Sequence, residues 1–161
     1  SADMPALGGV YKLSAIIENG KITPKIKLSD NSAKITNPGF KTVYRIYDED
    51  GMAAADLIAL RSETFDSNKP LTIVHPVDRW KKITFEPGKY TIRELPVKVI
   101  ENGKATGEKP TLKEIVDYAK EEKKTFWDEY KRIDKPHIYK VDLSDGLYEL
   151  KQNMIDEIRR G

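Results

Sequence analysis

The sequence contains no cysteine, which excludes disulfide bridges, thiolate nucleophiles and cysteine-bound zinc. It has no apolar run approaching the roughly eighteen residues that cross a bilayer, and its first residues lack the basic-then-apolar order of a secretory signal. These absences fit a reducing compartment, and we expect a cytoplasmic protein with no membrane partner.

Catalytic and metal-binding residues are also scarce. The two histidines, His75 and His137, each adjoin a proline, and neither has the spacing with carboxylates that a metal site requires. No serine lies in a Gly-x-Ser-x-Gly sequence, so a nucleophile elbow is absent. The residues alone therefore predict neither a catalytic group nor a bound metal in this chain.

Charge is nearly balanced, at +2 over 161 residues, which argues against nucleic acid as a partner. One segment departs from this balance. Between residues 21 and 45 a single acid, Asp30, faces the basic residues Lys21, Lys25, Lys27, Lys34, Lys41 and Arg45. Lysines on alternate positions protect an edge strand against aggregation, and the same lysines could form the wall of an anion site. The residues leave both interpretations open.

Two Asn-Gly pairs predict tight hairpin turns, at residues 18–21 and 101–104, because both central residues of a type I′ turn need positive φ. The first turn joins expected strands at 10–17 and 22–28. Further short strands are expected at 43–47, 57–60, 70–75, 83–85 and 90–100, while residues 52–55 are ambiguous between strand and helix.

After Pro110 the apolar period becomes helical. A helix is expected over 111–131, opened by a capping box of Thr111 and Glu114. Its apolar face would pack in the core through Leu112, Ile115, Val116, Ala119, Phe126, Trp127 and Tyr130. After a linker at 134–143, a second helix is expected from the N-cap Ser144 to about residue 161. The fold class is α+β, with an antiparallel, strand-rich first two-thirds followed by two amphipathic helices.

A glycine pair, Gly8 and Gly9, stands just before the first expected strand, which contains Lys12. Glycines at such a place allow the backbone to approach a ligand or a neighbouring chain closely. A complete phosphate loop would also need a helix N-terminus or a Walker pattern, and neither is present. By itself the glycine pair is a weak signal.

Several motifs occur together in one order along the chain. They are PALGGVYKL at 5–13, KIKLS at 25–29, KITNPG at 34–39, VYR at 43–45, HP at 75–76, REL at 93–95, LKEI at 112–115, WDEYK at 127–131 and YKVDLS at 139–144. In this order they resemble the C-terminal portion of the longer nicotinate phosphoribosyltransferases of bacteria and animals. The resemblance covers nearly the whole chain.

The resemblance implies a reaction in which nicotinate attacks phosphoribosyl pyrophosphate, pyrophosphate leaves and nicotinate mononucleotide forms, a step of NAD synthesis. Mg²⁺ neutralises the pyrophosphate, and ATP drives turnover through a phosphorylated histidine. That histidine belongs to a segment upstream of the matched part, and His75 does not fit its motif. The chain alone is therefore expected to be inactive, with no catalytic residue, metal or cofactor of its own.

The same resemblance implies a fragment of a larger enzyme that contains an α/β barrel. Residues 1–17 would end the barrel, 18–109 would be the β-rich part, and 110–161 would be C-terminal helices packed on the same unit. Gly8, Gly9, Lys12, Lys25 and Lys27 would lie near bound phosphates. The expected partners are the missing N-terminal part, the substrates nicotinate, phosphoribosyl pyrophosphate and ATP, and a second subunit in a homodimer.

Two other functions remain open from the residues. One is a basic, β-rich module for RNA or another polyanion, with Tyr44, Tyr47 and Trp80 as stacking residues. Against it, no ribonucleoprotein motif occurs and the overall charge is near balance. The other is a structural or dimerisation domain, which is compatible with a place in the larger enzyme.

Overall fold

The computed structural model describes residues 9–160, so Gly8 lies outside the described residues. The chain divides into two compact units, residues 1–40 with 149–161 and residues 41–148. The expected domain boundaries at residues 17 and 109 concern the parent enzyme and stay a prediction. Among residues 9–160, no helix combines the length and the apolar character needed to cross a membrane.

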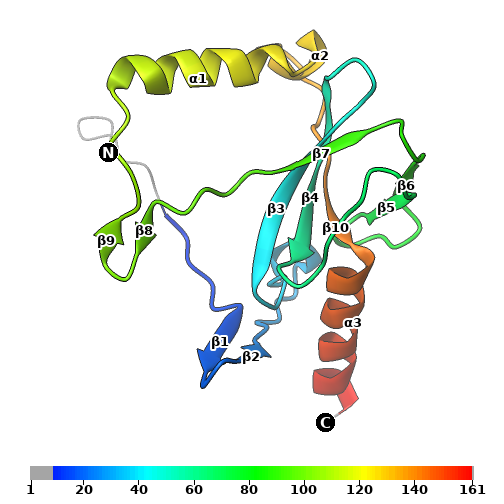
Figure 1. The fold of residues 1–161 in the computed structure, drawn as a ribbon. Helices are drawn as coiled ribbons and strands as arrows, with labels where there is room; N and C mark the ends of the chain where they lie inside the picture. Colours follow the sequence, from blue (N-terminus) through cyan, green and yellow to red (C-terminus); the bar gives the residue numbers. More distant parts are fainter. Residues whose placement is uncertain (1–8, 161) are drawn as a thin grey trace. The chain divides into compact units, whose positions relative to one another are not determined.

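A six-stranded sheet forms the centre of the larger unit (Figure 1). Its spatial order is β6-β5-β10-β4-β3-β7. The strands are β3 (Lys41–Tyr47), β4 (Ala53–Leu60), β5 (Leu71–Val74), β6 (Lys82–Phe85), β7 (Thr91–Glu94) and β10 (Val141–Ser144). All neighbours pair antiparallel except β10 and β4, which pair parallel. The strand-rich α+β prediction is confirmed, with this one parallel pairing added.

β4 supplies the centre of the core. Ala53, Ala55, Leu57 and Ala59 alternate along it with no exposed surface, which identifies the ambiguous segment at 52–55 as mostly strand. Ala55, Leu57 and Ala59 form one buried cluster with four residues of other segments, Ile46, Leu71, Ile73 and Tyr90. The Tyr90 hydroxyl donates to the carbonyls of Asp66 and Lys69, at 3.1 and 3.0 Å, so its burial leaves no lost hydrogen bond.

β10 corrects the expectation of a linker over 134–143. Its residues pair parallel with β4, Asp142 opposite Leu57, and antiparallel with β5, Leu143 opposite Val74. Four residues with two polar side chains carry too weak a period to predict a strand. The strand forms because both neighbours offer unpaired backbone groups, and Leu143 fills a second buried cluster with Val74, Leu147 and Tyr148.

The expected helix over 111–131 is two helices, α1 (Leu112–Lys124) and α2 (Asp128–Lys131). The capping box of Thr111 and Glu114 is confirmed. The break has a physical cause at Thr125, whose carbonyl accepts a hydrogen bond of 2.7 Å from the Ala53 amide and is therefore not left for a continuing helix. Phe126 then packs edge-on against Tyr139, with ring centroids 5.1 Å apart.

The prediction that the apolar face of α1 packs in the core is wrong. No residue of α1 is buried, and Leu112 is 77% exposed. The helix joins the sheet through its C-terminal end, at Glu122 and Thr125, while Figure 1 shows its first turns lying beyond the strands. Of the aromatic residues, Phe126 and Tyr130 contact Tyr139, whereas Trp127 is 43% exposed.

α3 (Asp145–Arg160) begins where β10 ends, and its N-cap prediction is confirmed. The Ser144 hydroxyl oxygen accepts a bond from the Leu147 amide at 3.2 Å and the hydroxyl donates to Glu63 Oε2 at 2.6 Å. The Glu63 carboxylate thus lies at the positive end of the helix dipole. A Cβ at Gly146 would stand 2.7 Å from Glu63 Oε1, so the Glu63 carboxylate would have to shift to admit a side chain there.

The smaller unit contains a hairpin of β1 (Ala15–Glu18) and β2 (Lys21–Pro24), followed by a 3₁₀ turn at Ser32–Lys34. The expected strands at 10–17 and 22–28 are therefore shorter than predicted. The hairpin turn itself is confirmed, with φ of 49° at Asn19 and 76° at Gly20. The matching turn at Asn102 and Gly103, in the larger unit, joins β8 (Ile100–Glu101) to β9 (Lys104–Ala105).

In the same smaller unit, α3 carries a buried lysine. Lys151 is 3% exposed and its ammonium group donates to Asn37 Oδ1 at 2.9 Å. Burial lowers the pKa of Lys151 below its ordinary value, because a desolvated ammonium group is disfavoured. The bond fastens α3 to the turn that contains Asn37.

Replacing Leu143 by alanine tests the central place of β10. Leu143 has no exposed surface, so Leu143→Ala should lower the free energy of unfolding by about 2–5 kcal/mol, measured by urea denaturation. The control is Val141→Ala in the same strand, where the side chain is 44% exposed and the expected loss is below about 1 kcal/mol. Equal losses in both variants would contradict the burial of Leu143.

Candidate functional site

A cleft of about 660 Å³ in the smaller unit gathers four lysines. Its walls are residues 10–13, residues 25–29 and Lys34, and we call it the lysine cleft. Lys12, Lys25, Lys27 and Lys34 all line it, beside apolar side chains such as Leu13 and Ile26. Ammonium groups around one hollow raise the local potential, which favours a bound anion.

Backbone hydrogen bonds hold the walls of the lysine cleft together. The Ser14 carbonyl accepts from the amides of Lys25 and Gly39, at 2.8 and 2.7 Å, and the Lys27 carbonyl accepts from the Thr36 amide at 3.2 Å. The Lys12 ammonium group donates to the Lys34 carbonyl at 2.5 Å. The hairpin turn at Asn19 and Gly20 returns the chain so that these segments meet.

The structure brings three of the five predicted site residues to this one cleft, namely Lys12, Lys25 and Lys27. Gly9 is described but does not line it, and a Cβ on Gly9 would only touch the Tyr11 ring, 3.5 Å away. Glycine is therefore not required there by the chain's own packing. Phosphate binding by any of these residues stays a prediction.

Sequence reasoning did not select Lys34 as a site residue. It stood in the basic segment at 21–45 and in the motif at 34–39, and no spacing rule links it to Lys12, 22 positions away. Within residues 9–160, no carboxylate lies within ion-pair distance of any of the four cleft lysines. Their positive charge is therefore not neutralised within this part of the chain.

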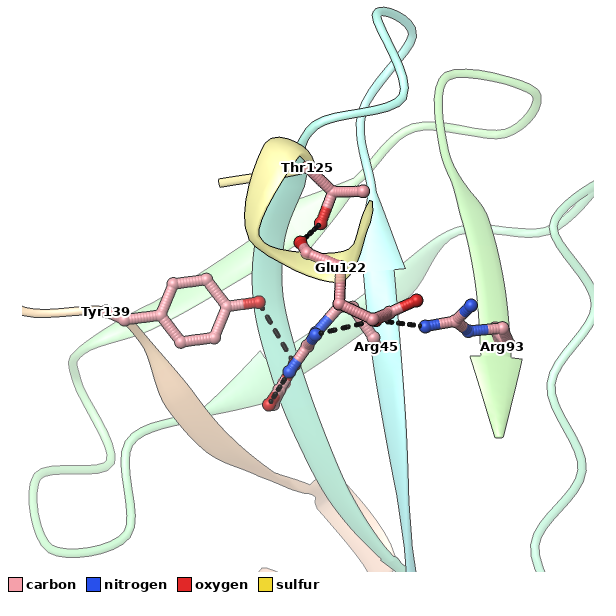
Figure 2. Close-up of polar contacts among 6 residues, drawn as sticks. Arg45, Arg93, Glu122, Thr125 and Tyr139 are labelled. Atoms are coloured by element: carbon pink, nitrogen blue, oxygen red, sulfur yellow. Dashed lines mark hydrogen bonds and ion pairs between the residues drawn. The ribbon is translucent and has the colours of Figure 1, made fainter. Parts of the chain in front are cut away.

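The last cation of the basic segment, Arg45, is held in the larger unit instead. Its guanidinium donates to both carboxylate oxygens of Asp56, from Nε at 2.8 Å and from Nη2 at 3.0 Å. Tyr139 donates its hydroxyl to Asp56 Oδ1 at 3.0 Å, and the Phe126 ring lies 4.6 Å from the guanidinium carbon. Figure 2 shows Tyr139 and Glu122 on opposite sides of this guanidinium.

Glu122 of α1 completes the cluster by joining two arginines (Figure 2). Its Oε2 accepts from Arg93 Nη2 at 2.6 Å and from Arg45 Nη1 at 3.4 Å. The hydrogen bond to Glu122 raises the pKa of Arg93, and the bond to Asp56 raises that of Arg45. Burial, with the Asp56 charge, raises the pKa of Tyr139. Each charge has a partner, so this cluster is a structural clasp between α1 and the sheet.

Both histidines contact neighbouring groups of the fold. His75 Nδ1 accepts from the amides of Val77 and Asp78, at 3.3 and 3.1 Å, and so caps a turn. The His137 ring lies edge-on to Tyr130, 6.4 Å between centroids. Over residues 9–160, no three histidine, aspartate or glutamate side chains converge where a metal ion could be held.

Comparison with known proteins relates this fold to one family. The family model for the nicotinate phosphoribosyltransferase C-terminal domain matches residues 40–151. The chain belongs to this family. The match covers the whole six-stranded sheet, α1, α2 and the first half of α3, so the family assignment rests on the larger unit rather than on the lysine cleft.

Relatives of the nicotinate phosphoribosyltransferase family match more of the chain. The chain is 38% identical over 160 residues to nicotinate phosphoribosyltransferase of Bacillus subtilis, covering 98% of this chain and 32% of that protein. It is 36% identical over 147 residues to the Caenorhabditis elegans protein of the same name, covering 90% and 25%. The chain thus spans between a quarter and a third of the length of these relatives.

The crystal structure of human nicotinic acid phosphoribosyltransferase has the same fold over part of its length. It superposes with a TM-score of 0.62 at 23% identity, over 73% of this chain and 23% of the human chain. At this identity the comparison supports the fold alone. It agrees with the sequence prediction that the strand-rich unit is a fragment of a larger enzyme.

Replacing Tyr139 by phenylalanine tests the clasp. The variant keeps the ring contacts but loses the hydroxyl that donates to Asp56, so we expect a free energy of unfolding about 1–3 kcal/mol lower at neutral pH. The pKa of Tyr139 is raised above the ordinary 10.0, so this stabilisation is complete below about pH 10 and is lost as the pH rises further. Urea denaturation should show a smaller difference near pH 11 than near pH 7. Equal differences at both would refute this account.

Proposed function

We propose that the chain acts as the C-terminal portion of a nicotinate phosphoribosyltransferase, which converts nicotinate and phosphoribosyl pyrophosphate, with ATP, into nicotinate mononucleotide. The observation that carries this proposal is the family match over residues 40–151. Two relatives of that name also align to 98% and 90% of the chain. In residues 9–160 no three histidine, aspartate or glutamate side chains converge to hold a metal ion, and the chain covers only 32% of the Bacillus relative. The isolated chain is therefore proposed to be inactive.

Within this proposal, the lysine cleft binds a phosphate-bearing group of a substrate or product. The support is geometric, since Lys12, Lys25, Lys27 and Lys34 surround one hollow without a carboxylate partner in residues 9–160. Lysine acts as a point charge toward phosphate, and several lysines suit a ligand with more than one phosphate oxygen. Gly8 and Gly9 remain proposed contacts through their backbone amides.

Mg²⁺ and ATP belong to the proposed activity of the whole enzyme. Mg²⁺ prefers carboxylate and phosphate oxygens, and residues 9–160 contain no group of three or more carboxylate or histidine side chains that could hold a metal ion. The residues present therefore do not fit a Mg²⁺ site, and we assign no step through the metal to this chain. A homodimer and a cytoplasmic location complete the proposal.

The alternative of an RNA-binding module gains no support. Its three stacking candidates are Tyr44, Tyr47 and Trp80, and two of them are engaged within the fold. Tyr44 packs edge-on against Phe65 at 5.2 Å, and Tyr47 lies under Arg93, 5.4 Å from the guanidinium carbon. Of the three, Trp80 is the exposed one, at 77%.

A chimeric enzyme tests the proposed function. In it, this chain replaces the matched segment of the Bacillus subtilis nicotinate phosphoribosyltransferase. We expect the chimera to form nicotinate mononucleotide from nicotinate, phosphoribosyl pyrophosphate, ATP and Mg²⁺, as measured by chromatography. The Bacillus enzyme without the segment is the control and should be inactive. A folded chimera without activity would contradict the proposal, and so would product formation by the 161-residue chain alone.

A pair of double variants tests the lysine cleft, with inorganic pyrophosphate as the probe. Lys25→Gln with Lys27→Gln should weaken pyrophosphate binding at least about tenfold in titration calorimetry, because charge-assisted contacts to phosphate are lost. Lys21→Gln with Lys104→Gln is the control, since both lysines are exposed, lie beside hairpin turns and do not line the cleft. Both double variants lose two positive charges. If both weaken pyrophosphate binding equally, the binding depends on the overall charge and not on the lysine cleft.

A further inference from the structure

Six exposed apolar side chains lie in two groups of three within residues 97–116 of the larger unit, one beside β8 and one at the start of α1, and we call this set the apolar arm. It consists of Val97, Val99, Ile100, Leu112, Ile115 and Val116. Their exposed fractions range from 40% at Val116 to 80% at Val97. Single exposed apolar residues are ordinary, but Leu112, Ile115 and Val116 share one side of a helix, and such a side is normally covered by another protein surface.

The helical part of the apolar arm has the pattern of a buried face. Leu112, Ile115 and Val116 lie at helical spacing on one side of α1. The other side is solvated and charged, as the ion pair between Lys113 and Asp117 shows, with a distance of 2.6 Å. Such a helix normally buries its apolar side, and within residues 9–160 nothing buries it.

The helix that carries Leu112, Ile115 and Val116 has a capped start and is fixed to the sheet at its C-terminal end. At its start, the Thr111 hydroxyl and amide bond the Glu114 carboxylate at 2.8 and 2.7 Å. At its end, Glu122 pairs with Arg93 at 2.6 Å, and the Thr125 carbonyl accepts from the Ala53 amide. A surface already held in position loses less conformational freedom on docking.

The family match and the length of the relatives indicate which protein surface covers the apolar arm. The matched domain includes the apolar arm, so the arm is part of the domain and not an appendage to it. The domain is C-terminal in its family, and the Bacillus relative is about three times as long as the matched segment. Most of the relatives' chain therefore precedes the domain. The six side chains carry no charge, which calls for an apolar counterpart.

We propose that the apolar arm docks against an apolar surface of the enzyme segment that precedes this domain. This inference rests on the proposed function, since it needs the longer enzyme. It assigns to Leu112 and Ile115 a role in holding the two parts of the enzyme together and no role in the stability of the domain by itself.

Two double variants on α1 test the docking surface in the chimera with the Bacillus enzyme. Leu112→Gln with Ile115→Gln changes the apolar side, and Lys113→Gln with Lys120→Gln, on the charged side, is the matched control. Glutamine is a good helix former, so α1 persists in both variants. We expect the first pair to lower the melting temperature of the chimera by about 4 °C or more and the control pair to change it little. In the 161-residue chain, neither pair should shift the melting temperature.

Each other outcome has a distinct meaning. An unsubstituted chimera that folds without activity sinks the proposed function, whatever the variants do. An active chimera whose melting temperature is unaffected by Leu112→Gln with Ile115→Gln overturns the docking surface and leaves the proposed function standing. A shift of the same size in the 161-residue chain overturns it too, because the side chains would then stabilise the domain itself. Sedimentation of the 161-residue chain as a dimer that this pair abolishes would assign the surface to a second copy instead.

Discussion

The larger unit depends on one short strand, β10, which pairs with β4 on one side and with β5 on the other. No other strand pairing joins β4 to β5 in this sheet. β5 with β6 lies on one side of it, and β4 with β3 and β7 lies on the other. If β10 were absent, β4 and β5 would each present a row of unpaired backbone groups. The chain therefore needs residues after both α1 and α2 to complete a sheet that begins at Lys41.

The clasp around Arg45 explains how the chain reaches β10. Arg45 of β3 and Asp56 of β4 lie opposite each other in register, and Tyr139, two residues before β10, bonds the same carboxylate. Glu122 adds the end of α1 to this group. Because the Arg45 and Asp56 side chains are only 14% exposed, removing one partner would leave the other poorly solvated. The cluster thus holds two segments against the sheet, the end of α1 through Glu122 and the residues before β10 through Tyr139.

Local chemistry in the sequence predicted the turns, caps and alternating strands, because each depends on neighbouring residues. The two Asn-Gly turns, the Thr111 box and the Ser144 cap are of this kind. Contacts between distant residues were not predictable. The strand β10 was missed because it pairs with β4 and β5, which lie far away in the sequence, and the end of α1 was missed because it is set by the amide of Ala53.

In the candidate site, too, local signals were predictable from the sequence and contacts between distant residues were not. Lys12, Lys25 and Lys27 were selected through the resemblance, and their convergence depends on a hairpin that the Asn-Gly signal does predict. Lys34 joins them through the return of the chain after that hairpin, which no local pattern encodes. The exposed side of α1 was misassigned for a simple reason. A helical period shows that one side is apolar, but not whether its cover lies in the same segment of chain.

The close approach of Glu63 to Gly146 couples two positions that are 83 residues apart in the sequence. A methyl group at 146 would raise helix propensity, yet it would displace a carboxylate that also accepts bonds from the Leu60 amide and the Ser144 hydroxyl. A larger residue at 146 therefore requires the Glu63 carboxylate to leave these hydrogen bonds or a shorter residue at 63. Across the family, the two columns should covary, and glycine should persist wherever glutamate does.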